Sequence, residues 1–263
     1  MAGNDAFELV RARGWRGGLE NLLSMELGKW FKTNMWWVQG LIWLLVVNGV
    51  LAGLLFGEED FPASDAVAMV GIFAGMFPAI AVVIIMQDAL VGEKEAGTAA
   101  WVLSKPASRK AFLLSKWVAN VLGVLVTMVV IPCLAAFVLI SYTRPGEIAL
   151  LPYLGGMGLL WVNATYYLSL TLMLGSFFNH RGPVIGIPLA LAFGQQMLFG
   201  LLPALINVLP WTIVVPAGDL DSAIFPSLVS GQPLPNLMPL YVTSACIPLF
   251  LLLALWRFEK EEL

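Results

Sequence analysis

A chain of 263 residues in which 59% are hydrophobic and only 12% are charged cannot build the surface of a water-soluble protein, because ordinary soluble domains carry about 25% charged residues. Its 2 cysteines and 1 histidine are too few for a disulfide framework or a histidine-based metal site. The formal net charge of −3 gives no reason to expect a nucleic-acid partner.

The first predicted element covers residues 15–32, after a start that has no apolar core of the kind a secretory signal needs. One stripe at helical spacing consists of Leu19, Leu22, Leu23, Glu26 and Trp30. This spacing predicts an amphipathic helix at the membrane interface. Several glycines lower the helical propensity, so a cytosolic helix packed on a partner is the alternative.

Six stretches without acidic or basic side chains are long enough to cross about 30 Å of hydrocarbon as helices. They are residues 35–56, 66–87, 117–140, 151–178, 183–202 and 238–256. A central lysine, arginine or aspartate would cost about 2.5–3.5 kcal/mol on insertion, so six clean windows are a strong signal. The sequence predicts an all-α polytopic membrane protein, with residues 1–263 forming a single transmembrane domain.

Lysine and arginine fall almost entirely on one side of the predicted spans. Only Arg144 lies on the other side, where Glu58, Asp60, Asp219 and Asp221 make the loops acidic. Because cytoplasmic loops carry the excess of basic residues, we expect a multi-pass protein of the plasma or inner membrane with both termini in the cytosol.

Residues 203–237, before the last span, are apolar but interrupted by six prolines and two aspartates. Proline removes a backbone donor and breaks helix interiors, so this stretch is expected to be helical only in short pieces. We predict an outer-side re-entrant or surface element, whose irregular backbone must be shielded by protein or lie near water.

The loop 88–116 between the second and third spans has a structured pattern. An Ala-rich stretch over residues 96–103 favours helix, Lys105-Pro106 ends it, and Ser108 is placed to begin the next helix. A short helix protruding into the cytosol would let a partner push on the second and third spans. A solvated loop that obeys the positive-inside rule is the simpler alternative.

In these features the chain resembles the membrane subunits of type-2 ABC (ATP-binding-cassette) transporters, the ABC exporter permeases. That family links the second and third spans by an acidic residue, a glycine with a small polar residue, then Leu, Pro and Ser-Arg. The matching positions here are Glu93, Gly97-Thr98, Leu103, Pro106 and Ser108-Arg109. Residues 32–37 and the ending ALWRFEKEEL, residues 254–263, are also similar to the family.

The resemblance implies that the loop carries a coupling helix that docks in a cleft of an ATPase subunit. The implied coupling residues are Glu93, Lys94, Glu95, Gly97, Thr98, Leu103, Pro106 and Arg109. It also implies two ATP-binding-cassette ATPases and a second permease copy, identical or similar, as partners. A Walker A sequence is absent, because Leu23 and Trp30 flank Gly28-Lys29 where Gly and Ser/Thr belong. ATP and Mg²⁺ are therefore expected in the partner ATPase, and neither a cofactor nor a catalytic site in this chain.

Uncharged polar residues inside the predicted spans are candidates for a translocation path, because polar groups are costly in a membrane. We select Asn48, Asn163, Gln195 and Gln196. Hydrogen bonds between helices are the alternative, and Asn120 belongs to the same group. Adjacent helical residues point about 100° apart, so at most one of the two glutamines faces a central path. Spans without charged residues favour a neutral or amphipathic cargo.

Three functions remain open on the sequence alone. The first is the permease subunit of an ABC exporter, which moves substrate by alternating access driven by ATP hydrolysis in separate subunits. The second is an ABC mechanotransmitter that acts on an outer-side partner without carrying cargo. The third is an integral membrane enzyme or scaffold that needs no ATPase; copurification with an ATPase would separate it from the other two.

Overall fold

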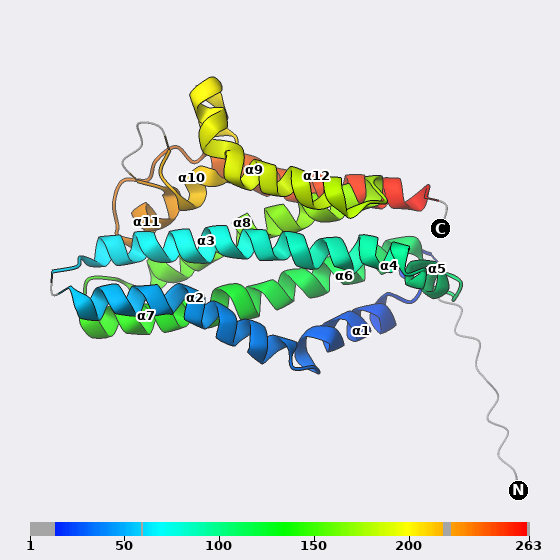
Figure 1. The fold of residues 1–263 in the computed structure, drawn as a ribbon, viewed down its shortest axis with the longest axis horizontal. Coiled ribbons are helices and arrows are strands. Elements are labelled where there is room, and N and C mark those ends of the chain that lie inside the picture. The colour runs from blue at the N-terminus through cyan, green and yellow to red at the C-terminus, as the bar shows by residue number, and fades with distance from the viewer. Residues whose placement is uncertain (1–13, 59, 218–221, 262–263) are drawn as a thin grey trace, which may run out of the picture.

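The computed structural model describes residues 14–58, 60–217 and 222–261, and every regular element in these ranges is helical (Figure 1). Within them, six helical stretches are long and apolar enough to cross a membrane, which confirms the predicted all-α polytopic fold. These stretches are Met35–Gly57, Ala63–Glu95, Arg109–Thr143, Leu150–Phe177, Arg181–Leu201 and Met238–Glu259.

Seven α-helices and one π-helical turn form most of the six spans. They are α2 (Met35–Gly57), α3 (Ala63–Gln87), α6 (Arg109–Val124), η2 (Leu125–Val130), α7 (Ile131–Thr143), α8 (Leu150–Phe177), α9 (Arg181–Leu201) and α12 (Met238–Glu259). Helices α6, η2 and α7 run on as one span. Of the six spans α8 is the most buried, and it packs against both α3 and α12.

The second and third spans extend furthest beyond the bounds that their charges suggested. The second continues past Gln87 to Glu95, and the third begins at Arg109 instead of residue 117. Lys94 and Lys116 lie inside these extensions, where each forms an ion pair with a glutamate of another segment. Because these charges are paired within the protein, they do not end the helices. The loop predicted over residues 88–116 is thus helical at both ends.

Helix α1 (Leu19–Phe31) packs along α6 of the same chain. Its buried residues are Leu22, Glu26 and Trp30, which belong to the stripe predicted from the sequence. A Cβ on Gly123 of α6 would lie 2.7 Å from Cε3 of Trp30 and closer still to two other ring atoms, so only glycine allows this approach. The location of α1 at the membrane interface stays a prediction.

The segment before α12 forms only short helical pieces in its described part, as its prolines predict. They are η3 (Pro203–Asn207), α10 (Trp211–Val214) and α11 (Ile224–Val229). Phe225 of α11 is fully buried, and its ring fills the space beside Gly71 of α3 and Gly156 of α8. The segment thus folds back onto the bundle; its re-entrant placement in a membrane stays a prediction, and Asp219 and Asp221 lie outside the described residues.

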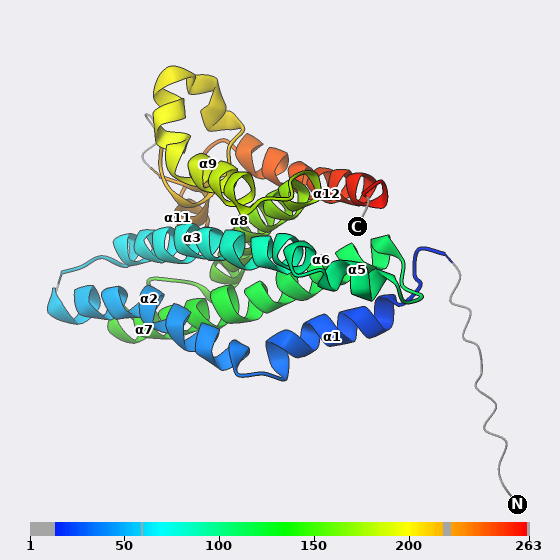
Figure 2. The ribbon, with the colours of Figure 1, turned by 45° about the vertical axis from the view of Figure 1, so that its right-hand side comes forward.

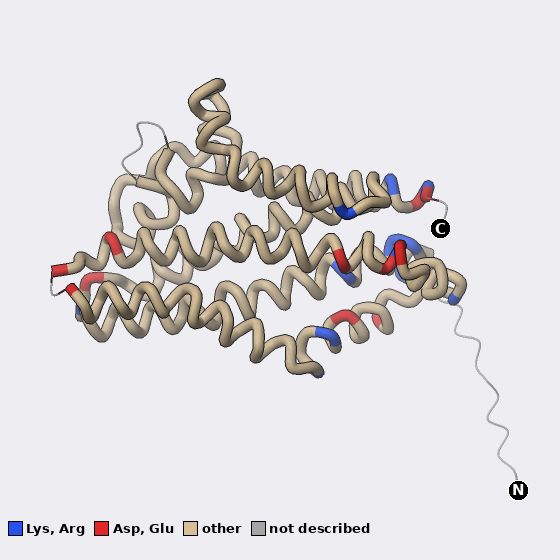
Figure 3. The backbone as a smooth tube through the Cα atoms, in the orientation of Figure 1, with Lys and Arg blue, Asp and Glu red and all other residues tan. Residues whose placement is uncertain are grey.

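Charged residues gather at the two ends of the bundle (Figure 3). The basic end carries α1, the short helices that follow α3, and the C-terminal end of α12 (Figures 1 and 2). The acidic end carries Glu58 after α2, Asp65 in the first turn of α3, and Arg144 after α7. This polarity is the one that the loop charges predicted, and the cytosolic location of the basic end stays a prediction.

Candidate coupling site at the basic end

The predicted coupling segment connects α3 to α6 at the basic end. A π-helical turn, η1 (Asp88–Gly92), leads into the single turn α4 (Glu93–Glu95), and the separate helix α5 (Thr98–Leu103) follows. Gly97 lies between α4 and α5 with a φ of 69°, in the left-handed region that favours glycine. The Thr98 hydroxyl donates to the Glu93 carbonyl at 3.1 Å and holds the corner together.

The helix predicted over residues 96–103 is therefore shorter, because Gly97 starts it in a left-handed conformation that a helix interior does not adopt. Its end at Leu103 and the start of the next helix agree with the sequence. Ser108 is the N-cap of α6, and its hydroxyl accepts the Ala111 N–H at 2.9 Å. The Ser108 backbone N–H also donates to Gly17, which ties this corner to the residues before α1.

Glu93 points into a partly buried ion-pair network within the chain. Its carboxylate accepts from the ammonium of Lys116 at 2.7 Å and from that of Lys29 at 3.2 Å. The same two lysines bind Glu26 of α1, at 2.8 Å and 2.9 Å. The Lys116 side chain is completely buried. We call these four residues the α1 network, because they join α1 and α6 to α4.

The α1 network shifts the pKa values of Glu26 and Lys29. Burial alone would raise the pKa of Glu26, but the ion pair with Lys116 and hydrogen bonds from both lysines hold this pKa below 4.5. Burial would lower the pKa of Lys29, yet Glu26 and Glu93 together raise it above 10.5. Both shifts favour the charged forms of Glu26 and Lys29, so attraction between opposite charges stabilises their ion pair.

Lys94 points the opposite way, toward α8 and the chain's C-terminal residues. Its ammonium donates to Glu261 at 2.6 Å and to the backbone carbonyl of Gly175, near the end of α8, at 2.8 Å. The side chains of Lys94 and Glu261 are each only 7% exposed. Arg109, another predicted coupling residue, donates to the carbonyls of Phe258 and Glu259 at the end of α12 and to that of Glu261 just beyond it.

Glu95 is the third charged residue of α4, and it pairs at the surface. Its carboxylate lies 2.9 Å from Arg181, the first residue of α9, and Asp88 lies 3.3 Å from the same guanidinium. These side chains are all 43% exposed or more. Such surface pairs contribute about 0–1 kcal/mol, so they are weak contacts that an incoming partner can replace.

The remaining predicted coupling residues form an open surface. Gly97, Thr98 and Pro106 are exposed, and Leu103 is half-buried. Between them stands Trp101, which is 65% exposed on α5 and has the Lys105 ammonium 5.1 Å from its ring centre. On the other face of α5, Ala99 is buried against the bundle. We call the exposed residues 97–106 the docking face.

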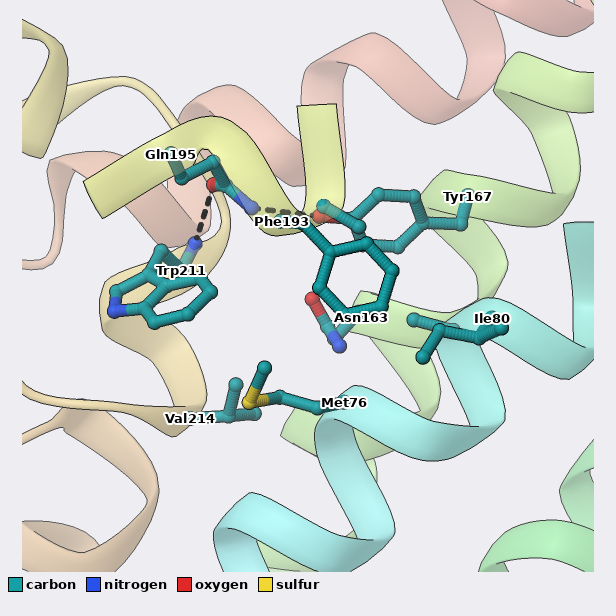
Figure 4. Close-up of a pocket in the computed structure, with 10 residues that line it drawn as sticks. Met76, Ile80, Asn163, Tyr167, Phe193, Gln195, Trp211 and Val214 are labelled. Carbon is teal, nitrogen blue, oxygen red and sulfur yellow. Dashed lines mark hydrogen bonds between the residues drawn. The ribbon is translucent and has the colours of Figure 1, made fainter. Parts of the chain in front are cut away.

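Two candidates for a translocation path meet in one small cavity between α3, α8, α9 and α10 (Figure 4). The Asn163 amide donates to the Gly75 carbonyl at 2.9 Å. Gln195 donates to the Tyr167 hydroxyl at 2.8 Å and accepts the Trp211 backbone N–H at 3.1 Å. The cavity measures about 20 Å³, which is room for about one water molecule. In this conformation both side chains serve as links between helices.

The other two candidates lie elsewhere. Asn48 of α2 donates to the carbonyls of Leu44 and Pro132, and it faces a separate apolar groove of about 570 Å³ between α2 and α7. Gln196 is exposed on the outside of α9, whereas its neighbour Gln195 is almost fully buried. The two glutamines thus point apart, as their adjacency predicted.

Sequence reasoning missed four residues of these sites: Glu26, Lys116, Trp101 and Glu261. Glu26 did carry a signal, because a carboxylate on a buried helical stripe requires a buried cation. Lys116 was counted among the basic loop residues, and nothing in the sequence marks its partner. Trp101 could have been noticed as the one aromatic residue within 96–106.

Comparison with known proteins gives an independent assignment. The family model described as ABC-2 family transporter protein matches residues 20–263, so the match covers α1, all six spans and the coupling segment. A search of curated proteins found no match. Permeases of this family associate with ATP-binding-cassette ATPase subunits and are the non-catalytic membrane part of the transporter. The chain belongs to the ABC-2 transporter family and is a membrane permease subunit of an ABC transporter.

Proposed function

We propose that this permease moves a substrate across the membrane by alternating access, driven by ATP hydrolysis in two ATPase subunits that dock on the docking faces of two permease copies. The observation that carries the proposal is the docking face itself. It presents an exposed tryptophan on a short helix, outside the hydrophobic spans and at the basic end. Tryptophan is among the residues most enriched at the energetic centres of protein interfaces.

The ion pairs behind the docking face support a mechanical role. Glu93 connects α4 to α1 and α6, while Lys94 connects it to α8 and the chain's C-terminal residues. A displacement of α4 and α5 by the ATPase would therefore act on several spans at once. Shifts of packed helices between two discrete arrangements are a known form of such transitions.

The basic end faces the cytosol in this proposal, in agreement with the positive-inside rule. ATP and Mg²⁺ belong to the ATPase subunits. The spans contribute uncharged polar groups such as Asn163 and Gln195, so we propose a neutral or amphipathic cargo. The small cavity between them corresponds to a closed path, which would widen only when the helices shift.

Replacement of Trp101 by alanine tests the docking face. The purified permease variant should bind its ATPase at least about tenfold more weakly, because loss of a central interface tryptophan costs more than about 1.4 kcal/mol. Titration of fluorescent ATPase against permease in nanodiscs measures the Kd. Trp37→Ala is the control, since Trp37 is also exposed but lies near the start of α2. Equal Kd values for Trp101→Ala and the parent would show that the docking face is not part of the interface with the ATPase.

A further inference from the structure

Residues 258–261, at and after the end of α12, are held by the coupling segment and the start of α6. Glu261 binds Lys94, and the carbonyls of Phe258, Glu259 and Glu261 accept hydrogen bonds from Arg109. The rings of Phe258 and Phe112 stack with centroids 5.7 Å apart, and both are 1% exposed. We call Lys94, Arg109, Phe112, Phe258 and Glu261 the C-terminal clamp.

Two properties make the clamp a firm attachment. The last carbonyls of a helix have no partner inside it, and Arg109 supplies charged donors to the carbonyls at the end of α12. Hydrogen bonds between charged groups are also stronger than neutral ones, and the ion pair of Lys94 with Glu261 is shielded from water. Neighbouring Glu259 differs, because its pair with Lys110 is 40% and 46% exposed.

The geometry of α4 gives the clamp its place in the mechanism. Consecutive residues of a helix point about 100° apart, so Glu93 and Lys94 reach different sides of the same turn. Glu93 binds the α1 network, whereas Lys94 binds the end of α8 and Glu261. One helical turn beside the docking face is thus attached to two separate groups of helices.

We propose that the C-terminal clamp makes the basic end of α12 follow the coupling segment, with Lys94 and Glu261 as the positioning pair. The inference rests on the proposed function, because it assumes that an ATPase moves α4 and α5. Helix α12, the sixth span, would then receive the movement of α4 through the ion pair of Lys94 with Glu261, and not only through its packing on α8.

Distance measurements between spin labels test the clamp. Labels at Ser104 on the docking face and at Lys260 after α12 report whether the two parts move together; Cys133 and Cys246 are replaced by alanine. Permease and ATPase are reconstituted in nanodiscs, diluted with unlabelled permease, and measured without nucleotide and with a non-hydrolysable ATP analogue. The variants are Glu261→Gln and Lys94→Gln, alone and together, and Glu259→Gln is the matched control.

In the parent and in Glu259→Gln, the distance from Ser104 to Lys260 should stay the same when nucleotide is added. In Glu261→Gln and Lys94→Gln it should change, because the coupling segment then moves without α12. The distance change in the double variant should be no larger than in either single variant, because both substitutions remove the same interaction. ATPase binding should persist throughout.

Three results would contradict the inference, and they are distinguishable. If Glu261→Gln behaves like Glu259→Gln while the ATPase binds the parent, the clamp transmits nothing and the proposed function stands. If the ATPase does not bind the parent at all, the proposed function fails and this inference fails with it. Additive effects of Lys94→Gln and Glu261→Gln would also count against a positioning pair.

Discussion

Gly123→Ala should separate α1 from α6. The new Cβ would lie 2.7 Å or less from three atoms of the Trp30 ring. That ring is 3% exposed, and its N–H donates to Asn120 at 3.2 Å, so it cannot move aside without losing its hydrogen bond. Overpacking of this kind costs about 1–3 kcal/mol. We expect a lower melting temperature and faster hydrogen exchange in peptides from α1.

Gly158→Ala is the matched control for this prediction. Gly158 also lies within a helix, and nothing is within 4 Å of the position that its Cβ would take. Alanine favours helix over glycine by about 0.5–1 kcal/mol, so this variant should be at least as stable as the parent. Equal melting temperatures and equal exchange in α1 for both variants would show that Trp30 does not fix α1 on α6.

Lys116→Met should be the most destabilising single change at the basic end. It leaves Glu26 without its completely buried partner and takes one of two cations from Glu93. Loss of one partner of a buried ion pair costs about 3–5 kcal/mol, and here Glu26 and Glu93 would share only the half-exposed Lys29. Denaturation in mild detergent, followed by circular dichroism, measures the loss.

Two further variants separate charge from packing. Lys110→Met removes a lysine of the same helix whose pair with Glu259 is exposed, so it should cost about 0–1 kcal/mol. Combining Lys116→Met with Glu26→Gln and Glu93→Gln removes the two carboxylates that have lost this cation and should recover most of the stability. If Lys116→Met is no less stable than Lys110→Met, the α1 network does not hold α1 in place.

Hydropathy was sufficient to predict the six spans, because uncharged length is a local property that the sequence displays directly. It failed where charges are compensated by distant residues. Lys94 and Lys116 were assigned to a loop, yet Glu261 and Glu26, far away in the sequence, allow the helices to continue through them. No local rule identifies such partners.

The predicted coupling residues also divide into features that local sequence rules predict and features that distant contacts decide. The positions of Gly97, Leu103 and Ser108 agree with local rules for turns, helix ends and caps. The direction of a side chain is different, since it depends on what surrounds the helix. The resemblance implies that Glu93 and Lys94 take part in coupling, and in the structure both form ion pairs with residues of this chain. Their contacts therefore fit residues that pass movement on to other helices better than residues that bind the ATPase.

Site-specific photo-crosslinking shows whether an ATPase subunit docks on residues 97–106. A photoreactive amino acid is placed at Ser104 on the docking face or at Leu151, which is 80% exposed at the acidic end. We expect a crosslinked product with the ATPase from Ser104 and none from Leu151. A product from Leu151, or no product from Ser104 in a complex that copurifies intact, would contradict this docking.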